Sequence, residues 1–246
     1  MAALFISDLH LDPSRPAVTE LFLSFLRQEA ASAERLYILG DLFEAWIGDD
    51  DPDRHHARVM AGVRELTTSG VPVFFMHGNR DFLIGTVFAD KTGVKLLADP
   101  TVVDLYGIPT LLMHGDSLCT DDVEYQKVRK LFRDPDWQRA FLAKPLQERR
   151  AFAAEARAES RSQTAAKAEY IMDVNQMAVT RIMQEHGVRR LIHGHTHRPA
   201  VHRFASGGIG RTRIVLGDWH EKPSCLRWQV LGGVLEDPRV TDGAAN

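Results

Sequence analysis

The sequence is poor in cysteine and has no long apolar run. Its 246 residues include only two cysteines, Cys119 and Cys225, and the two form no motif. This excludes a disulfide-stabilised scaffold and fits a protein kept in a reducing compartment. No segment approaches the roughly 18 consecutive apolar residues that span a membrane, and the first residues lack the basic region of a signal peptide. We therefore expect a protein that stays in the cytoplasm.

The sequence also lacks a strong excess of positive or negative side chains. The formal net charge is −3, from 30 basic and 33 acidic side chains, which argues against a basic nucleic-acid-binding surface over the whole molecule. We therefore expect no nucleic-acid partner. The hydrophobic content of 44% is that of an ordinary globular protein, and a chain of this length can bury a substantial core.

Short apolar segments recur along the chain, and nearly every one ends in a cluster of Gly, Asp, Asn or His. Such segments predict buried strands, and we expect strands at 4–6, 36–39, 73–76, 101–105, 110–113, 191–192 and 214–216. Apolar residues at helical spacing predict amphipathic helices at 19–29 and 56–67. The late strands have no helices between them, which predicts an α/β fold with one mixed sheet or two stacked ones. Because ligands bind outside the carboxyl ends of strands in open α/β sheets, the polar clusters should converge on one crevice.

The middle of the chain differs from its flanks because it is helical throughout. Asp134-Pro135 is typical of a helix start and Lys144-Pro145 of a stop. Residues 121–170 carry 11 Lys and Arg against 9 Asp and Glu. Such a stretch inside an α/β domain indicates an insertion that forms a cap. We expect a core of residues 1–120 and 184–236, a helical insertion of 121–183 and a disordered tail of 237–246.

Five polar clusters at the predicted strand ends contain metal-ligating residue types. They are Asp8-Leu9-His10, Gly40-Asp41, Gly78-Asn79-Arg80-Asp81, His114 and Gly194-His195-Thr196-His197. In Asp-x-His and His-x-His the two ligands lie two residues apart, so on an extended segment both side chains point to the same side. Each cluster alone has a commoner structural explanation; Gly-Asp, for example, occurs three times and usually marks a turn. All five together predict a metal centre.

The donor set indicates what kind of centre this is. Carboxylates, imidazoles and an amide suit Mn²⁺, Fe²⁺ or a similar ion and do not suit a closed thiolate zinc site. Seven candidate ligands are too many for one open catalytic ion and about right for two, which can activate water and clamp a phosphoryl oxygen. The sequence therefore predicts hydrolysis of a phosphate ester or anhydride. The candidate ligands are Asp8, His10, Asp41, Asn79, His114, His195 and His197.

In their order the clusters resemble those of the calcineurin-like metallophosphoesterases, whose pattern runs D-x-H, G-D, G-N-H-[DE], H and G-H-x-H. The match extends from Asp8 to His197. The resemblance implies a four-layer αββα sandwich, that is, two stacked mixed sheets flanked by helices, with the helical insertion as a cap. It also implies which ligands share an ion: Asp8, His10 and His197 for one, Asn79, His114 and His195 for the other, with Asp41 bridging the two.

One position departs from the family pattern. Where the family usually has His in the Gly-Asn-His element, this chain has Arg80. Arginine does not act as a general acid near neutral pH, but its planar guanidinium suits two phosphate oxygens. The departure favours a substrate with more phosphate charge than a simple monoester, such as a pyrophosphate.

Longer strings resemble one branch of that family, the UDP-2,3-diacylglucosamine pyrophosphatases of bacterial lipid A biosynthesis. The strings span residues 5–11, 40–50, 78–83, 114–122, 193–199 and 216–219. The resemblance implies that water attacks the α-phosphorus of UDP-2,3-diacylglucosamine to give UMP and 2,3-diacylglucosamine 1-phosphate, with two Mn²⁺ ions as cofactor. The residues that it implies in catalysis are Asp41, Asn79, Arg80 and His195.

Four residues of the insertion, Arg157, Ser160, Thr164 and Lys167, fall on one face of a helix. Two cations and two hydroxyls suit a phosphorylated sugar, although such a face is more often simply solvated. The resemblance implies substrate contacts at Ser160, Thr164 and Lys167. Further contacts that we expect at or near the substrate are Asn79, Arg80, Asp122, Tyr125, Arg157 and His195.

The apolar residues of the insertion allow two interpretations. At helical spacing such residues usually form a core. A cap of a few helices cannot bury all of them, however, so some could line a slot for two acyl chains. The residues are Val128, Leu131, Phe132, Trp137, Phe141, Leu142 and Phe152.

A lipid-linked sugar nucleotide as substrate would bring the protein to a membrane. We expect it to lie peripherally on the cytoplasmic side of the inner membrane, where the net positive insertion meets anionic lipid. No obligate protein partner is indicated. The alternatives are another calcineurin-like esterase that acts on soluble nucleotides, and a scaffold that has lost catalysis. The scaffold is disfavoured because all seven ligands are present.

Overall fold

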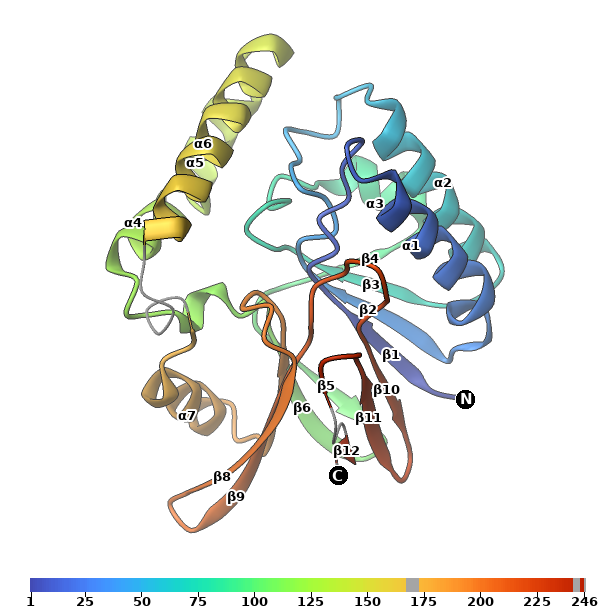
Figure 1. Cartoon of the computed structure of the whole chain (residues 1–246), viewed down its shortest axis with the longest axis vertical. Coiled ribbons are helices and arrows are strands. Elements are labelled where there is room, and N and C mark those ends of the chain that lie inside the picture. Colours follow the sequence, from blue (N-terminus) through green and yellow to red (C-terminus); the bar gives the residue numbers. More distant parts are fainter. Residues whose placement is uncertain (167–172, 241–243, 246) are drawn as a thin grey trace.

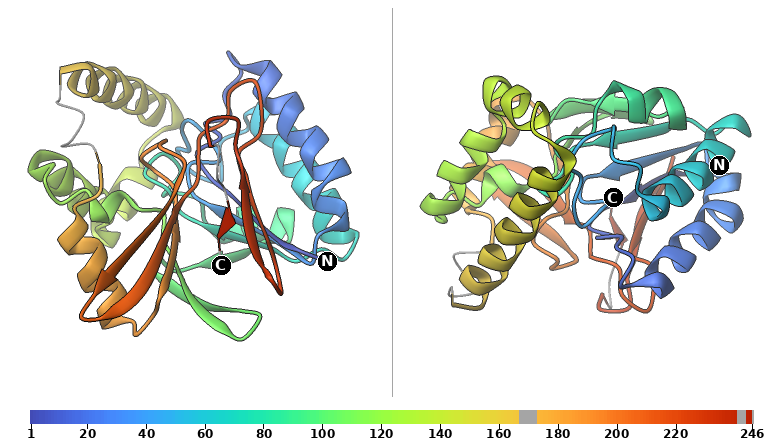
Figure 2. Two further views of the ribbon diagram at one scale, coloured as in Figure 1. Left: turned by 60° about the horizontal axis from the view of Figure 1, so that its bottom comes forward. Right: turned by 90° about the horizontal axis from the view of Figure 1, so that it is seen from above.

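Two β-sheets stacked face to face form the centre of the molecule, and helices cover their outer faces (Figure 1; Figure 2). The computed structural model describes residues 1–166, 173–240 and 244–245, with the backbone alone at 161–166. Both sheets mix parallel and antiparallel strands. The predicted α/β fold with two stacked mixed sheets is therefore confirmed.

The first sheet has the strand order β12-β11-β10-β1-β2-β3-β4. Its strands are β1 (Ala3–Ile6), β2 (Arg35–Leu39), β3 (Val73–Met76), β4 (Lys95–Leu97), β10 (Cys225–Gln229), β11 (Gly232–Glu236) and β12 (Ala244–Ala245). The second sheet has the order β5-β6-β7-β9-β8. Its strands are β5 (Thr101–Leu105), β6 (Ile108–Leu112), β7 (Arg190–His193), β8 (Ala200–Ser206) and β9 (Ile209–Val215). The sequence analysis identified the central strands of both sheets and missed β4, β8 and the antiparallel strands β10 to β12.

Alternating side chains on the strands build three apolar layers. On β1, Leu4 faces the helices α1 (Pro16–Gln28), α2 (Arg54–Thr68) and α3 (Thr86–Thr92), whereas Phe5 faces the second sheet. Phe5 shares the middle layer with Ile192 of β7. On the outer side of the second sheet, Leu191 packs against Val179 of α7 (Gln176–Glu185). Three layers of apolar side chains therefore separate four layers of secondary structure.

The parallel strands of the two sheets position the polar clusters. In the first sheet β1, β2 and β3 run parallel to one another, and in the second sheet β6, β7 and β9 do so. Loops that follow these strands leave the sandwich at their carboxyl ends. The predicted ligand clusters occupy those loops, as expected for a site outside strand ends.

Three helices of the insertion stand beside this end of the sandwich: α4 (Val123–Phe132), α5 (Pro135–Leu142) and α6 (Leu146–Ala166) (Figure 1). The first turn of α6 is attached to the loop after β2. There the Arg149 guanidinium donates to both carboxylate oxygens of Asp50, at 2.8 and 2.5 Å, and to the Ile47 carbonyl at 2.7 Å. Among the residues that the structure describes, no helix is long and apolar enough to cross a membrane.

Helix α7 lies in the segment that we expected to belong to the insertion, but it packs on the second sheet. Its residues Val179 and Met183 share a buried cluster with Leu111 and Leu191. This packing is that of a helix covering a sheet, so α7 belongs structurally to the core. The insertion therefore ends before α7 rather than at residue 183.

Part of the tail that we expected to be disordered is ordered. Asp237 is buried and accepts two hydrogen bonds from the Arg239 guanidinium, at 2.8 and 2.7 Å. Arg239 also donates to Asp218 at 2.6 Å. Ala244–Ala245 form β12 and pair with β11. The order depends on Arg239 reaching Asp218, 21 positions earlier in the sequence, and on the pairing of β12 with β11, which a local pattern does not reveal.

Trp219 joins helix α1 to the loop after β9, and its loss should destabilise the fold. Its ring is fully buried with edges toward Phe22 and Phe25, at centroid distances of 6.2 and 5.3 Å. We expect Trp219→Ala to lower the free energy of unfolding by about 3–5 kcal/mol, because the cavity cannot collapse completely. Urea unfolding measures this. The control is Val230→Ala at an exposed position, where we expect a change within about 0.5 kcal/mol; equal losses for both variants would contradict the assignment.

Candidate metal centre

All seven predicted ligands lie in loops at the carboxyl ends of parallel strands, and both sheets contribute. The ligands are Asp8 and His10 after β1, Asp41 after β2, Asn79 after β3, His114 after β6, and His195 and His197 after β7. Side-chain distances of 2.9 to 3.8 Å link all seven into one cluster. The structure therefore brings together the residues that the sequence assigned to one site.

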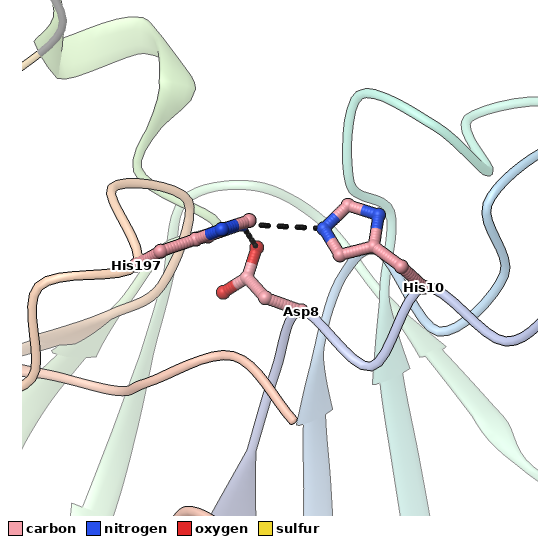
Figure 3. Close-up of side chains that lie close together, drawn as sticks. All are labelled: Asp8, His10 and His197. Carbon is pink, nitrogen blue, oxygen red and sulfur yellow. Dashed lines mark hydrogen bonds and ion pairs between the residues drawn. The ribbon is translucent and has the colours of Figure 1, made fainter. Parts of the chain in front are cut away.

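Asp8, His10 and His197 form the first half of the cluster (Figure 3). His10 and His197 approach from opposite sides of Asp8, and their Nε2 atoms lie 3.2 Å apart. His197 Nε2 lies 3.5 Å from Asp8 Oδ1. That oxygen is buried and forms no hydrogen bond within the described residues. An orphaned carboxylate oxygen facing two imidazoles is the arrangement that a cation would complete.

In both imidazoles Nδ1 faces a carboxylate outside the cluster, which determines the role of Nε2 inside it. His10 Nδ1 lies 3.0 Å from Glu44 Oε2, and His197 Nδ1 lies 3.4 Å from Asp218 Oδ2. A carboxylate beside Nδ1 holds the imidazole proton on that atom, so Nε2 is left as a metal ligand. Once both Nε2 atoms are unprotonated, they present two lone pairs 3.2 Å apart. The donor set therefore fits a metal ion that takes the place of a proton.

Asn79, His114 and His195 form the second half. Asn79 Oδ1 lies 2.9 Å from both His114 Nε2 and His195 Nδ1. His114 Nδ1 faces the Leu39 carbonyl at 2.9 Å, so that nitrogen keeps its proton, and Nε2 is the nitrogen that can exchange its proton for a cation. With Nε2 unprotonated, this half offers an amide oxygen and two imidazole nitrogens and fits a cation.

Asp41 lies between the two halves. Its Oδ2 is 3.7 Å from His10 Nε2 and 3.8 Å from His114 Nε2. Its Oδ1 accepts a hydrogen bond from the Arg80 backbone N–H at 2.8 Å. One carboxylate oxygen is thus held by the protein while the other faces both imidazole groups. This is the position that a bridging ligand requires.

The ligand loops have an unusual backbone. Non-glycine residues with positive φ are uncommon, because the side chain crowds the carbonyl. Five of the six such residues in the described part of the chain are predicted ligands: Asp8, His10, Asp41, His195 and His197, with φ between 49° and 69°. Strain of this kind persists only where surrounding contacts hold it, and it gathers at functional sites.

Two glycines of the motifs are required by close approach. A Cβ atom at Gly78 would clash with the Asp41 carboxylate, and one at Gly194 would clash with the Asp8 carboxylate and the Ser7 side chain. The glycines therefore allow the loops of the two sheets to meet around the carboxylates. This gives a physical reason for glycine before Asn79 and His195 in the sequence.

The electrostatics of the cluster favour positive charge. Burial lowers the pKa of His197, but hydrogen bonds to Asp218 and Asp8 outweigh this and raise it to about 10. Burial likewise lowers the pKa of His114, and the charges of Asp41, Asp116 and Asp8 raise it to about 9. For Asp8 the imidazoles more than offset the effect of burial, so its pKa lies well below the usual range. The carboxylates thus stabilise a cation at this edge.

Four carboxylates that the sequence analysis did not assign support the ligands. Glu44 and Asp218 hold His10 and His197, as described above. Asp81 is buried and accepts the backbone N–H groups of Leu42 and Gly78 at 2.7 and 2.8 Å. Asp116 accepts from the Tyr125 hydroxyl at 2.9 Å. Asp116 and Asp218 belong to two Gly-Asp pairs that we interpreted as turns. Gly-Asp occurs three times in the sequence, each time after a predicted strand, and this repetition was the signal that could have identified them.

The candidate substrate contacts lie at different distances from the cluster. Arg80 Nη2 donates to Ser160 Oγ of α6 at 3.3 Å, which brings the insertion to the ligand loops. The Tyr125 ring stacks on His195 at a centroid distance of 5.8 Å. Asp122 accepts from the Tyr125 N–H and caps α4. Arg157 is half-buried on α6. Only the backbone is described at Thr164, and Lys167 lies outside the described residues.

Replacement of Asp81 should weaken metal binding without removing a ligand. Burial and the charge of Asp41 raise the pKa of Asp81 to about 6, and its carboxylate fixes the loops that carry Asp41 and Asn79. In Asp81→Asn an amide nitrogen would face backbone donors, so we expect Mn²⁺ affinity to fall about 10–100-fold. Calorimetric titration with Mn²⁺ measures this. Asp104→Asn is the control, because Asp104 accepts a turn N–H at an exposed site; unchanged affinity in Asp81→Asn would refute the role.

Comparison with known proteins agrees with this geometry. The model of the calcineurin-like phosphoesterase family matches residues 1–199. A UDP-2,3-diacylglucosamine hydrolase of Xanthomonas axonopodis pv. citri is 54% identical over 243 residues, 96% of this chain and 98% of the relative. A protein of the same name from Stenotrophomonas maltophilia is 52% identical with the same coverage. Among solved structures, an archaeal phosphodiesterase is similar with a TM-score of 0.48 and 11% identity, over 96% of this chain and 99% of that one. This chain belongs to the calcineurin-like phosphoesterase family.

Proposed function

We propose that this protein hydrolyses the pyrophosphate bond of UDP-2,3-diacylglucosamine by attack of water at the α-phosphorus. The products are UMP and 2,3-diacylglucosamine 1-phosphate, as required in lipid A biosynthesis. Relatives of that name are 54% and 52% identical over nearly the whole chain. The observation that carries the proposal is the contact of Arg80, beside the ligand cluster, with Ser160 of the insertion at 3.3 Å. A phosphate-binding group and a hydroxyl of the cap thus flank the candidate metal centre.

We assign two divalent ions to the seven ligands. One ion would be held by Asp8, His10 and His197, the other by Asn79, His114 and His195, with Asp41 shared. When bound, such a pair activates water and neutralises charge on the phosphoryl oxygens. The mixed oxygen and imidazole donors suit Mn²⁺, which we propose as the ion. The orphaned oxygen of Asp8 and the facing imidazole nitrogens support this assignment.

Arg80 orients the phosphate and does not transfer a proton. Its backbone N–H fixes Asp41, and its side-chain Nε is buried without a hydrogen-bond partner among the described residues. A guanidinium with a free N–H can bind phosphate oxygens in a fork. Because arginine stays protonated, the leaving phosphate must depart as an anion. That chemistry suits an anhydride, whose leaving group is a sugar phosphate.

We further propose that the sugar phosphate lies between the ligand cluster and α6. The core would contact it through Asn79, Arg80 and His195, and the insertion through Asp122, Tyr125, Arg157, Ser160, Thr164 and Lys167. Tyr125 acts through its ring, because its hydroxyl donates to Asp116. Stacking on His195 then orients that imidazole at the phosphate.

The apolar residues of the insertion divide into a packed and an exposed group. Rings within the insertion contact one another at centroid distances of 4.7 to 6.1 Å, namely Phe132, Trp137, Phe141 and Phe152. Phe82 of the core stacks on Phe132, which joins this group to the core. Val128, Leu131 and Leu142 are exposed and make none of these ring contacts, while Phe152 is partly exposed as well as packed. We propose that the exposed group contacts the acyl chains and that the packed group supports it.

We also propose a peripheral position on the cytoplasmic side of the inner membrane. A diacylated product is insoluble in water and has to be delivered to lipid. The exposed apolar residues on α4 and α5 support contact with a bilayer surface, and the excess of basic side chains in residues 121–170 favours anionic lipid.

Hydrolysis of UDP-2,3-diacylglucosamine in detergent tests the proposed function. We expect release of UMP with Mn²⁺, none with a chelator, and no release from UDP-glucose, because UDP-glucose lacks the acyl chains. Chromatography of the nucleotide product measures all three. No UMP from the lipid substrate, in protein that cleaves a generic phosphodiester with Mn²⁺, would contradict the substrate assignment and leave the metal centre in place.

The same assay tests Arg80. Loss of a charge-assisted hydrogen bond to phosphate costs about 1.5–3 kcal/mol, so we expect kcat/KM of Arg80→Ala to fall about tenfold to hundredfold. Arg58→Ala is the control, because Arg58 is exposed on α2 and pairs with Glu20. We expect Arg58→Ala to match the wild type. Wild-type activity in Arg80→Ala would rule out the phosphate contact.

A further inference from the structure

A cavity of about 340 Å³ lies directly behind the candidate metal centre. It is formed by the loop that carries His197 and by the ends of β8 and β9. Its walls include the metal ligand itself and the residues that follow it, and they are rich in arginine. The residues that matter here are Thr196, His197, Arg198, Ala200, Arg213 and Val215. The cavity is thus continuous with the cluster on the side of His197.

Of the three arginines that line this cavity, two form ion pairs with carboxylates and one does not, among the described residues. Arg198 pairs with Asp173 at 3.2 Å, and Arg239 pairs with Asp218 and Asp237. Arg213 is only 6% exposed, and its Nη1 contacts His193 Nε2 at 3.3 Å. In the part of the chain that the structure describes, no carboxylate forms an ion pair with Arg213 and its Nε has no hydrogen-bond partner. Asp173 in the cavity wall offsets part of this charge at longer range, and the Nε–H of Arg213 remains available to an acceptor bound in the cavity.

A second donor in the same wall is also unused. Thr196 Oγ1 is buried and has no partner among the described residues. Opposite these polar groups, Pro199, Ala200 and Val215 supply apolar surface. Apolar walls with a few unpaired donors are typical of a small-molecule site, and about 300–1,000 Å³ is the usual volume of one. The chemistry fits a planar base with carbonyl groups that is attached to a phosphate.

The position of the cavity indicates which half of a substrate it would take. His10 and His197 lie on opposite sides of the first half of the cluster (Figure 3). Glu44, which holds His10, is close enough to Arg80 for their charges to interact. Arg80 meets the insertion at Ser160. The contacts of Arg80 and Ser160 thus lie on the side of His10, whereas the cavity lies on the side of His197.

We propose that this cavity binds the uridine half of the substrate, with Arg213 and Thr196 as donors to its oxygen atoms and Ala200 and Val215 against the ring. The inference rests on the proposed function, since it assumes a nucleoside diphosphate sugar as substrate. The scissile phosphate would then span the ligand cluster, with the acylated sugar under the insertion and the nucleoside on the far side. The protein would read the two ends of the substrate with two separate surfaces.

The test is to fill the cavity without touching the ligands. Ala200→Trp places a large ring in the cavity, and Ala205→Trp on the exposed side of the same strand β8 is the matched control. Calorimetry on the Mn²⁺-loaded protein measures the Kd of UMP and of inorganic phosphate, which probes the metal centre alone. We expect Ala200→Trp to weaken UMP at least about tenfold, as for loss of one buried polar contact. Phosphate binding should be unchanged, and Ala205→Trp should match the wild type.

A second variant guards against a misfolded first one. Thr196→Val keeps the size of the side chain and removes one of the two proposed donors, so it should weaken UMP several-fold and again spare phosphate. Equal UMP affinity in wild type, Ala200→Trp and Thr196→Val would overturn the uridine site. Failure of the proposed function would look different: the wild type would release no UMP from the lipid substrate, whatever the variants do to the Kd of UMP.

Discussion

Two buried carboxylates, Asp8 and Asp41, at the shared edge of two sheets constrain the rest of this structure. Burying a charge costs several kcal/mol unless it is paired, and here the partners are imidazoles, which carry positive charge when protonated and offer lone pairs to a cation when they are not. The pKa values of His114 and His197, raised to about 9 and 10, express the same imbalance. The edge therefore favours positive charge, and the seven candidate ligands form one electrostatic unit rather than seven separate sites.

The supports of this unit extend well beyond the ligand loops. Asp218 holds His197, and Arg239 holds Asp218 while it also pairs with Asp237. The order of the chain after β11 is thus linked to the orientation of His197, a candidate metal ligand. Asp81 plays a similar part in the first sheet, where its carboxylate gathers the backbone N–H groups of the loops after β2 and β3. Positive φ at five ligands persists because such contacts surround them.

The features that could be predicted from the sequence were those with a local pattern. An apolar run followed by a polar cluster identified β1, β2 and β3 together with Asp8 and Asp41, and strand geometry then implied a common edge. The failures were non-local. In the sequence Asp116 and Asp218 are part of ordinary Gly-Asp turns. Their roles depend on Tyr125 and His197, which lie beside them only in the folded chain. The order of the tail depends on the hydrogen bond from Arg239 to Asp218. The position of α7 depends on its packing against the outer face of the second sheet.

The insertion is fastened to the same loops that carry the ligands. Arg149 joins α6 to Asp50 and Ile47 in the segment after Asp41, and Ser160, three turns further along α6, meets Arg80 directly after Asn79. Seen from above, α6 lies on the side of the molecule away from α1 and α2 (Figure 2). A movement of α6 would therefore displace Arg80 and the Asp41 loop together. In the proposed function, acyl chains bound on α4 and α5 would be coupled to phosphate orientation through α6, because Phe132 of α4 and Phe141 of α5 pack on Phe152 of α6, and α6 also meets the Arg80 guanidinium.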